Sequence, residues 1–309
     1  MESIQHIKSR LGAVGNIGTI TRAMEGVSAT KMRKAQCLAI SSRPYAFATL
    51  SALTNLLQYA PDEHLENAPL VQARAIKNVL LVLVASDRGL AGSFNSQVTR
   101  VAEGYLKSLI LNEQVKLVLV GKRLSSWAAA SSLPVEMAFT GFGDYAEPSE
   151  VAPLSKLIID GYKDGTWDKV VVISSHFKTT LNQITLTREL LPMHIDMIRD
   201  TVRAIVPEHG RFAELREQVI NGVGTKHRTD YIFEPTASEV LENILPHLLG
   251  MQLFHLILEA NASEHSARMV AMKNASENAG ELSQTLSLQY NKVRQASITK
   301  EMIEITSAI

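Results

Sequence analysis

Several features that would indicate a secreted or membrane-spanning protein are missing from this sequence. Among its 309 residues only Cys37 is a cysteine, so no disulfide can form within the chain, as is typical of proteins of a reducing compartment. No run of about 18 apolar residues occurs, and we therefore expect no membrane-spanning helix. The opening stretch, MESIQHIKSR, has no apolar segment, so we also expect no signal peptide.

The motifs of catalytic and metal centres are also missing. The sequence has no HExxH, no Cys/His cluster with metal-ligand spacing and no serine in a nucleophile-elbow motif. His247 and His255 are too far apart along a helix to share a metal ion, and we expect them to face solvent or a partner. We therefore predict no catalytic residue, no cofactor-binding residue and no metal site.

One loop requires a choice between two interpretations. Ser86–Gly92 (SDRGLAG) follows an apolar run and precedes a helical pattern, where a doubly wound α/β fold carries its phosphate loop. The loop matches neither GxGxxG nor GxxxxGK[ST], and Asp87 could simply pair with Arg88. We interpret it as a tight strand-to-helix turn, with a nucleotide site as the alternative.

Proline is absent from the 63 residues after Pro246, and the only glycines there are Gly250 and Gly280. One helix of that length would extend about 95 Å and would need a partner along its length. Apolar or small residues recur every third or fourth position, a spacing closer to the 3.5 of a coiled coil than to 3.6. They are Met269, Met272, Ala275, Ala279, Leu282, Leu286, Tyr290, Val293 and Ala296. We predict a coiled-coil helix over residues 236–309; an ordinary buried helix is the alternative.

A second long helix is predicted over residues 1–58. Its stripe comprises Ile4, Ile7, Leu11, Val14, Ile17, Thr21, Met24, Val27 and Met32. Four glycines within this stripe suggest close approach of another helix, or a helix that depends on its partner for stability. Pro44 is expected to bend or interrupt the helix after Arg43. Two long helices that flank one domain can return to each other as an antiparallel pair.

The middle of the chain, residues 75–230, has the pattern of an α/β domain. Continuous apolar runs predict buried strands at 79–85, 116–120 and 168–174, with a short strand at 135–139 and an alternating edge strand at 183–190. Helices are predicted at 97–111, 123–131 and 150–163, and a linker at 59–75. Strands that alternate with helices indicate a mainly parallel sheet. A charged extra segment, 188–228, could include short helices at 193–206 and 211–219.

Formal net charge is zero, but the charge is unevenly distributed. Residues 1–44 carry seven Lys or Arg against two Glu, whereas residues 237–267 carry four Glu and neither Lys nor Arg. A basic helix needs an acidic neighbour, a phosphate or water. Nucleic acid is the less favoured partner, because aromatic side chains are not interleaved with these charges.

Both terminal helices carry long motifs of one family. The first is Ile20–Gln36 (ITRAMEGVSATKMRKAQ), followed by Ser42–Ala46 (SRPYA). The second is Ala267–Gly280 (ARMVAMKNASENAG), followed by Tyr290–Glu301 (YNKVRQASITKE), and Ser86–Leu90 (SDRGL) lies between. In order and spacing the chain resembles, over nearly its whole length, the gamma subunits of the rotary F-type ATP synthases.

This resemblance implies a long antiparallel coiled coil of the two terminal helices and a Rossmann-like α/β domain between them. The implied function is that of the central rotor stalk, which couples ion flow through the membrane c-ring to the cycling of the catalytic beta subunits and regulates ATP hydrolysis. ATP would be made on beta, so the chain itself would not be an enzyme. The implied partners are the alpha/beta hexamer, the epsilon subunit and the c-ring, at the cytoplasmic face of a bacterial inner membrane.

The motifs also imply contact residues by position. Met24 matches the position near the acidic lever loop of beta, and Arg10, Lys31, Arg33 and Lys34 supply positive charge for that loop. Arg294, Gln295, Thr299 and Glu301 match the stretch that meets the catch loops of beta. Core positions in the coiled coil remain the alternative for Met24, Ala296 and Ile298.

At the foot of the stalk, Tyr231, Phe233 and Glu234 match the stretch that contacts the c-ring and epsilon. Phe233 replaces a common tyrosine, which puts a hydroxyl contact there in doubt. A regulatory role for segment 188–228 is a hypothesis. Two rivals from other classes are a nucleotide-binding α/β enzyme that dimerises through its helices and a nucleic-acid-binding coiled coil, whose binding to DNA would depend steeply on salt.

Overall fold

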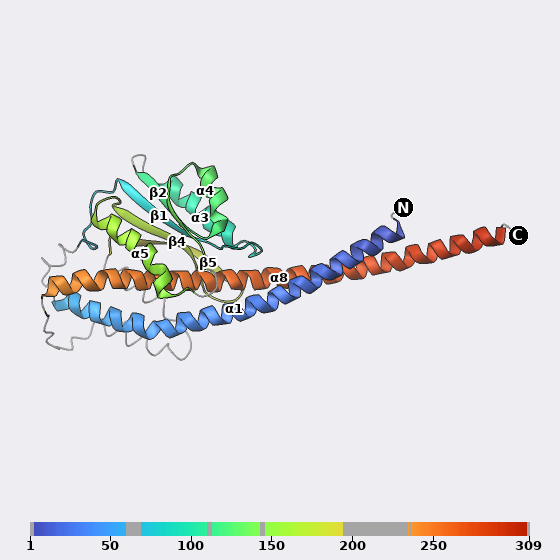
Figure 1. The fold of residues 1–309 in the computed structure, drawn as a ribbon, viewed down its shortest axis with the longest axis horizontal. Helices are drawn as coiled ribbons and strands as arrows, with labels where there is room; N and C mark the ends of the chain where they lie inside the picture. Colours follow the sequence, from blue (N-terminus) through green and yellow to red (C-terminus); the bar gives the residue numbers. More distant parts are fainter. Residues whose placement is uncertain are drawn as a thin grey trace.

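In the computed structural model, residues 3–59, 69–109, 113–142, 146–193, 234 and 236–307 are described. Two long helices, α1 (Ile4–Tyr59) and α8 (Ala237–Ser307), lie side by side as an antiparallel pair (Figure 1). An α/β domain packs against one end of this pair, and both chain termini lie at the opposite end. We call α1 and α8 together the shaft.

The α/β domain is built on a five-stranded sheet with the order β3-β2-β1-β4-β5. Its strands are β1 (Asn78–Val84), β2 (Gln114–Val120), β3 (Val135–Phe139), β4 (Lys169–Phe177) and β5 (Gln183–Leu191). The pairs β1–β2, β1–β4 and β2–β3 are parallel, whereas β5 pairs antiparallel with β4 and lies at the edge. The predicted mainly parallel sheet and its edge strand are therefore confirmed.

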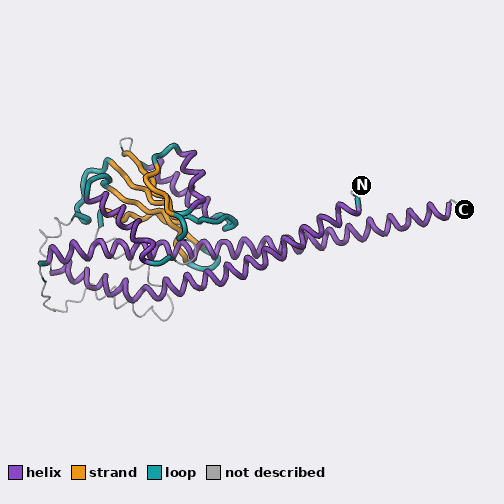
Figure 2. The backbone as a smooth tube through the Cα atoms, in the orientation of Figure 1, coloured by secondary structure: helices purple, strands orange, loops and turns teal. Residues whose placement is uncertain are grey.

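Both faces of the sheet are covered, which explains the continuous apolar runs. In β1, Leu80, Val82 and Val84 belong to a core shared with α5 (Pro148–Lys163) and α8. The alternate residues Leu81 and Leu83 belong to a second core, with α3 (Phe94–Ser108), the short 3-10 helix η1 (Lys122–Leu124) and α4 (Ser125–Ser131). The sheet thus lies between α3 and α4 on one side and α5 with α8 on the other (Figure 2).

The seam between α1 and α8 departs from the predicted stripe. Ile7 and Met32 are buried as expected, but Ile17 and Val27 are 53% and 55% exposed. Gly18 and Ser28 take the adjoining seam positions: a Cβ on Gly18 would lie 3.5 Å from the Cβ of Ala279, and Ser28 is buried. Small residues allow the two backbones to approach closely. The apolar pattern alone therefore predicted the wrong residues for these positions of the seam. On α8, Leu282 is likewise 43% exposed.

Neither proline in the shaft ends its helix. The backbone of α1 is helical from Ile4 to Tyr59, so the interruption predicted at Pro44 does not occur. Pro246 likewise lies inside α8, flanked by the buried Leu245 and Leu248. A proline removes one backbone hydrogen bond, and lateral packing of two long helices offsets that loss.

The predicted linker is partly a docking segment. Leu70 is buried in the domain core, and its carbonyl accepts a hydrogen bond from the N–H of Met193 at 2.8 Å. Arg74 lies over the ring of Tyr162, 4.4 Å from its centroid, and donates to the Tyr162 carbonyl. Residues 60–68 lie outside the described residues, as do the predicted short helices at 193–206 and 211–219 apart from Met193.

The register of the shaft can be tested by cross-linking Gly18→Cys to Ala279→Cys in a Cys37→Ser background. The distance of 3.5 Å between these two Cβ positions is within the range of disulfides. We expect near-complete oxidation, measured as a mobility shift on a non-reducing gel. Gly12→Cys paired with Ala279→Cys is the control, because a Cβ on Gly12 has no neighbour within 4 Å. Equal oxidation of both pairs would contradict this register.

Candidate functional site

Within the described residues, no three His, Cys, Asp or Glu side chains are placed together to hold a metal ion. None of the helices in this part of the chain is both long and apolar enough to cross a membrane. The fold does provide a cleft beside the shaft, an exposed helix end and a buried ionic cluster. Some of the predicted contact residues lie in the cleft or on the exposed helix end.

The loop Ser86–Gly92 is a turn that ties together the ends of three strands. The Ser86 N–H donates to Asn95 Oδ1 at 3.0 Å, and its hydroxyl lies 2.7 Å from the Arg88 carbonyl. The Asp87 carboxylate accepts the backbone N–H groups of Lys122 and Gly141, at 3.0 and 2.8 Å. The pairing of Asp87 with Arg88 considered from the sequence is therefore replaced by contacts to the loops after β2 and β3.

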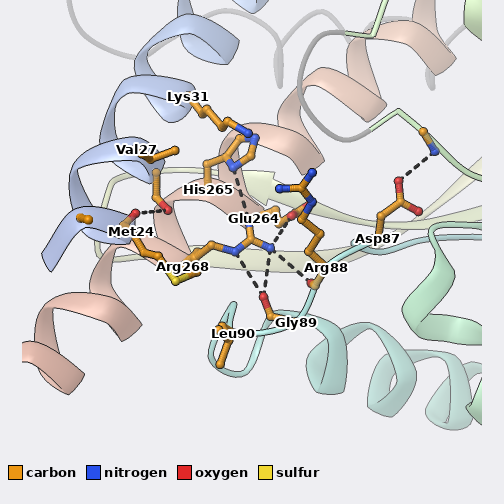
Figure 3. Close-up of a pocket in the computed structure, with 13 residues that line it drawn as sticks. Met24, Val27, Lys31, Asp87, Arg88, Gly89, Leu90, Glu264, His265 and Arg268 are labelled. Carbon is orange, nitrogen blue, oxygen red and sulfur yellow. Dashed lines mark hydrogen bonds and ion pairs between the residues drawn. The ribbon is translucent and has the colours of Figure 1, made fainter. Parts of the chain in front are cut away.

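A cleft of about 720 Å³ lies beside this loop, where the loop meets the shaft (Figure 3). Its lining includes Met24, Val27 and Lys31 from α1. From α8 it includes Glu264, His265 and Arg268. The loop contributes Asp87, Arg88, Gly89 and Leu90. Apolar side chains and charged side chains of both signs thus share one cleft at the junction of shaft and domain.

The structure places the predicted contact residues of α1 at different exposures. Met24 and Lys31 are half-buried in the cleft, whereas Arg10 and Arg33 are exposed on the shaft surface. Lys34 is also exposed. Only Met24 and Lys31 are therefore brought together, and Met24 is not a fully buried core residue.

The contact residues of α8 lie on a free end of the helix, residues 294–307, which we call the tip. Because Gly18 lies opposite Ala279, an equal rise in two antiparallel helices places Ile4 opposite about residue 293. The tip thus extends past the start of α1 (Figure 1). Arg294, Gln295, Thr299 and Glu301 are exposed on it. Ala296 and Ile298 are also exposed, so neither is a core residue here.

The predicted foot is only partly described. Glu234 is exposed, whereas Tyr231 and Phe233 lie outside the described residues.

A buried ionic cluster, which we call the Glu259 cluster, was not predicted from the sequence. Glu259 on α8 is 7% exposed, and its Oε2 lies 2.9 Å from His176 Nδ1 on β4 and 3.5 Å from Arg188 Nη1 on β5. Its Oε1 lies 3.2 Å from Nε2 of His255, one turn earlier on α8. His255 is buried, so its predicted exposure was wrong; His247 is exposed. The i,i+4 spacing was the one available signal, because the other partners come from distant strands.

The pKa of Glu259 reflects both its burial and its contacts in this cluster. Burial is the largest effect and by itself raises the pKa of the carboxyl group. Hydrogen bonds and charge from His176 and His255 outweigh it, so the pKa is lowered far below the ordinary 4.5. Glu259 is therefore ionised at neutral pH inside the domain, where it ties α8 to the two last strands of the sheet.

Comparison with known proteins gives one consistent family. A family model described as ATP synthase matches residues 3–309. The ATP synthase gamma chain of Roseiflexus castenholzii is 38% identical over 313 residues, which cover 99% of this chain and 97% of that one. The ATP synthase gamma chain of Gloeothece citriformis is 35% identical over 314 residues, with 99% and 98% covered.

Two solved structures with the same fold are chains of mitochondrial ATP synthases. A chain of the Euglena gracilis mitochondrial ATP synthase, in a structure of OSCP, F1 and c-ring, superposes with a TM-score of 0.64 at 14% identity. That match covers 99% of this chain and 93% of the other. A chain of the Tetrahymena thermophila mitochondrial ATP synthase central stalk and c-ring gives a TM-score of 0.57 at 23% identity, covering 83% and 99%.

Proposed function

The chain belongs to the ATP synthase gamma chain family, and from this we propose how its described surfaces work in the rotary complex. It is a non-catalytic subunit, the central rotor stalk that couples ion flow to ATP synthesis. We propose that the shaft turns inside the alpha/beta hexamer and that its asymmetric surface moves each catalytic beta subunit through its states. We assign residues 1–58 and 236–309 to the shaft and residues 75–230 to the α/β domain, of which residues 194–230 lie outside the described residues.

One observation carries this proposal: the shaft leaves its own domain and exposes apolar side chains along the projecting part. Leu288, on α8 before the tip, is 73% exposed, and Ile298, Met302 and Ile303 are exposed on the tip itself. Ile17 and Ile20 are also exposed on α1. Exposed apolar groups of this extent mark a surface that other proteins cover. A hexamer that encloses the shaft would cover it from all sides.

We assign the contacts with beta to two regions. Lys31 in the cleft, with Arg10 and Arg33 on the open surface of α1, presents positive charge to an acidic loop. Met24 lies in the same cleft and offers an apolar contact. Arg294, Gln295, Thr299 and Glu301 on the tip face the catch loops. The Thr299 hydroxyl donates to the Gln295 carbonyl at 2.9 Å and keeps its lone pairs for a partner donor.

At the opposite end we assign the foot, Tyr231, Phe233 and Glu234, to the c-ring and the epsilon subunit. The support for this assignment is the match of the sequence motif and the exposure of Glu234. The complex would then hold this chain at the cytoplasmic face of a bacterial inner membrane, with no membrane contact of its own.

Co-expression with the alpha and beta subunits of the same source tests this function. We expect a complex with one copy of this chain per hexamer, and altered ATP hydrolysis when residues 289–309 are deleted, because the deletion removes the tip. Subunit stoichiometry is measured by native mass spectrometry and hydrolysis by a coupled assay. The full-length complex is the control. If no complex forms, or if the purified chain alone binds ATP or NAD, the rotor-stalk assignment is wrong.

A further inference from the structure

The α/β domain has the crevice in which open α/β sheets bind ligands, but α8 occupies it. With the order β3-β2-β1-β4-β5, the chain adds strands on one side of β1 and then on the other, so the switch point lies between β1 and β4. Ligands of such sheets bind outside the carboxyl ends of the strands at this point. Here the segment Asn261–Arg268 of α8 crosses those carboxyl ends.

The contacts of this segment are hydrogen bonds to loop carbonyls. Arg268 Nη2 donates to the carbonyls of Arg88 and Gly89, after β1, at 3.2 and 3.3 Å, and its Nε donates to Gly89 at 3.3 Å (Figure 3). Asn261 Nδ2 donates to the carbonyl of Phe142, after β3, at 2.6 Å. The elements after β1 and β3 are thus both bonded to one stretch of helix.

The same stretch also bonds the end of β4. Ser263 Oγ donates to the Ser175 carbonyl at 3.3 Å, and Ser266 Oγ donates to the Thr180 carbonyl at 2.7 Å. The guanidinium of Arg268 is neutralised by Glu264, whose Oε1 lies 2.6 Å from Nη2, and both side chains are buried. The polar side chains on this face of α8 therefore donate to backbone carbonyls that would otherwise face a bound ligand.

These bonds differ in kind from the apolar part of the contact between α8 and the domain. Earlier on α8, Leu249, Leu253 and Leu256 pack in the apolar core. Apolar packing resists separation but has no preferred direction, whereas a hydrogen bond weakens steeply when its angle changes. Rotation of the domain about the helix axis is therefore opposed chiefly by the polar contacts, which are those of Asn261–Arg268 and those of the Glu259 cluster.

We propose that Asn261–Arg268 is the torque joint of the stalk, with Arg268 as its principal positioning residue. It fixes the rotational angle of the α/β domain about the shaft, so that rotation at the foot reaches the tip without slip. This inference rests on the proposed function. It also explains why a domain with a switch-point crevice serves as a mechanical coupling: the helix replaces the ligand.

The test uses the complete synthase in sealed vesicles, carrying Arg268→Gln in this chain. We expect the number of ions taken up per ATP hydrolysed to fall by roughly threefold or more, within the range by which single substitutions change coupling. ATP hydrolysis per complex should change less, because the tip still turns in the hexamer. Arg100→Gln, an exposed arginine on α3, is the matched control. If the number of ions taken up per ATP hydrolysed is unchanged in assembled Arg268→Gln complexes, the proposal is wrong.

A covalent bridge separates slip from general damage. A Cβ on Gly92 would lie 3.8 Å from that of Ala271, a disulfide distance between the same loop and the same helix. In a Cys37→Ser background, Gly92→Cys with Ala271→Cys should restore coupling to Arg268→Gln when oxidised and lose it again on reduction. A formed disulfide that restores nothing overturns the proposal.

Two controls complete this design. Gly92 has φ +56°, so the stapled chain with Arg268 intact is measured first and should couple normally despite local strain. If Arg268→Gln alone does not assemble, the complex is assembled with the staple closed and then reduced, which poses the same test. Failure of the unsubstituted chain to join a hexamer would instead count against the rotor-stalk function.

Discussion

Replacing Glu259 by alanine is expected to destabilise the protein by about 3–5 kcal/mol, because it leaves His176, His255 and Arg188 without their shared carboxylate inside the fold. Denaturant unfolding of the full chain measures this loss. Glu136→Ala is the matched control, since Glu136 pairs with Lys116 at the surface, where the side chains are 33% and 41% exposed. That control should cost less than about 1 kcal/mol. A loss of less than about 1 kcal/mol for Glu259→Ala would show that the Glu259 cluster contributes little.

The same residue predicts a direction of acid sensitivity. The pKa of Glu259 is lowered by folding from the ordinary 4.5, so below that value the unfolded chain binds a proton that the folded chain does not. The stabilisation is therefore present above about pH 4.5 and is lost as the pH falls toward the folded pKa. Glu259→Ala should flatten this part of the stability profile, and Glu136→Ala should leave it unchanged.

Gly161→Ala is expected to destabilise the α/β domain by about 2 kcal/mol or more, although alanine favours helices. The gain in helix propensity is at most about 1 kcal/mol. Against it, a Cβ at position 161 would lie 2.0–2.4 Å from ring atoms of Trp167. The ring cannot easily move, because Trp167 is buried and its Nε1 donates to the Ile158 carbonyl at 2.9 Å. Overpacking of this kind outweighs the propensity term.

Thermal unfolding of the full chain tests this sign. Gly104→Ala on α3 is the control, because a Cβ there meets nothing within 4 Å, and it should stabilise by about 0.5–1 kcal/mol. Adding Trp167→Leu should reduce the cost of Gly161→Ala, and the double-mutant cycle gives the coupling between the two sites. If both glycine variants stabilise the chain, the tight contact is absent.

What could be predicted from the sequence was local or carried by long motifs. The apolar run of β1 predicts a strand covered on both faces because each alternate side chain must be buried. The proline-free stretch predicts a helix too long for its own domain. These features follow from spacing along one segment, and the terminal motifs then identify the family.

The amino-acid sequence by itself determined the types of element, their order and the family, whereas the tertiary structure decided which neighbours meet. Spacing placed Ile17 and Val27 in the seam, but Gly18 and Ser28 occupy it, because close backbone approach favours small residues over apolar ones. The bond from Arg268 to Gly89 joins residues 179 positions apart. Such contacts depend on how α8 crosses the sheet, and no local pattern encodes that crossing because several packings satisfy the same periodicity.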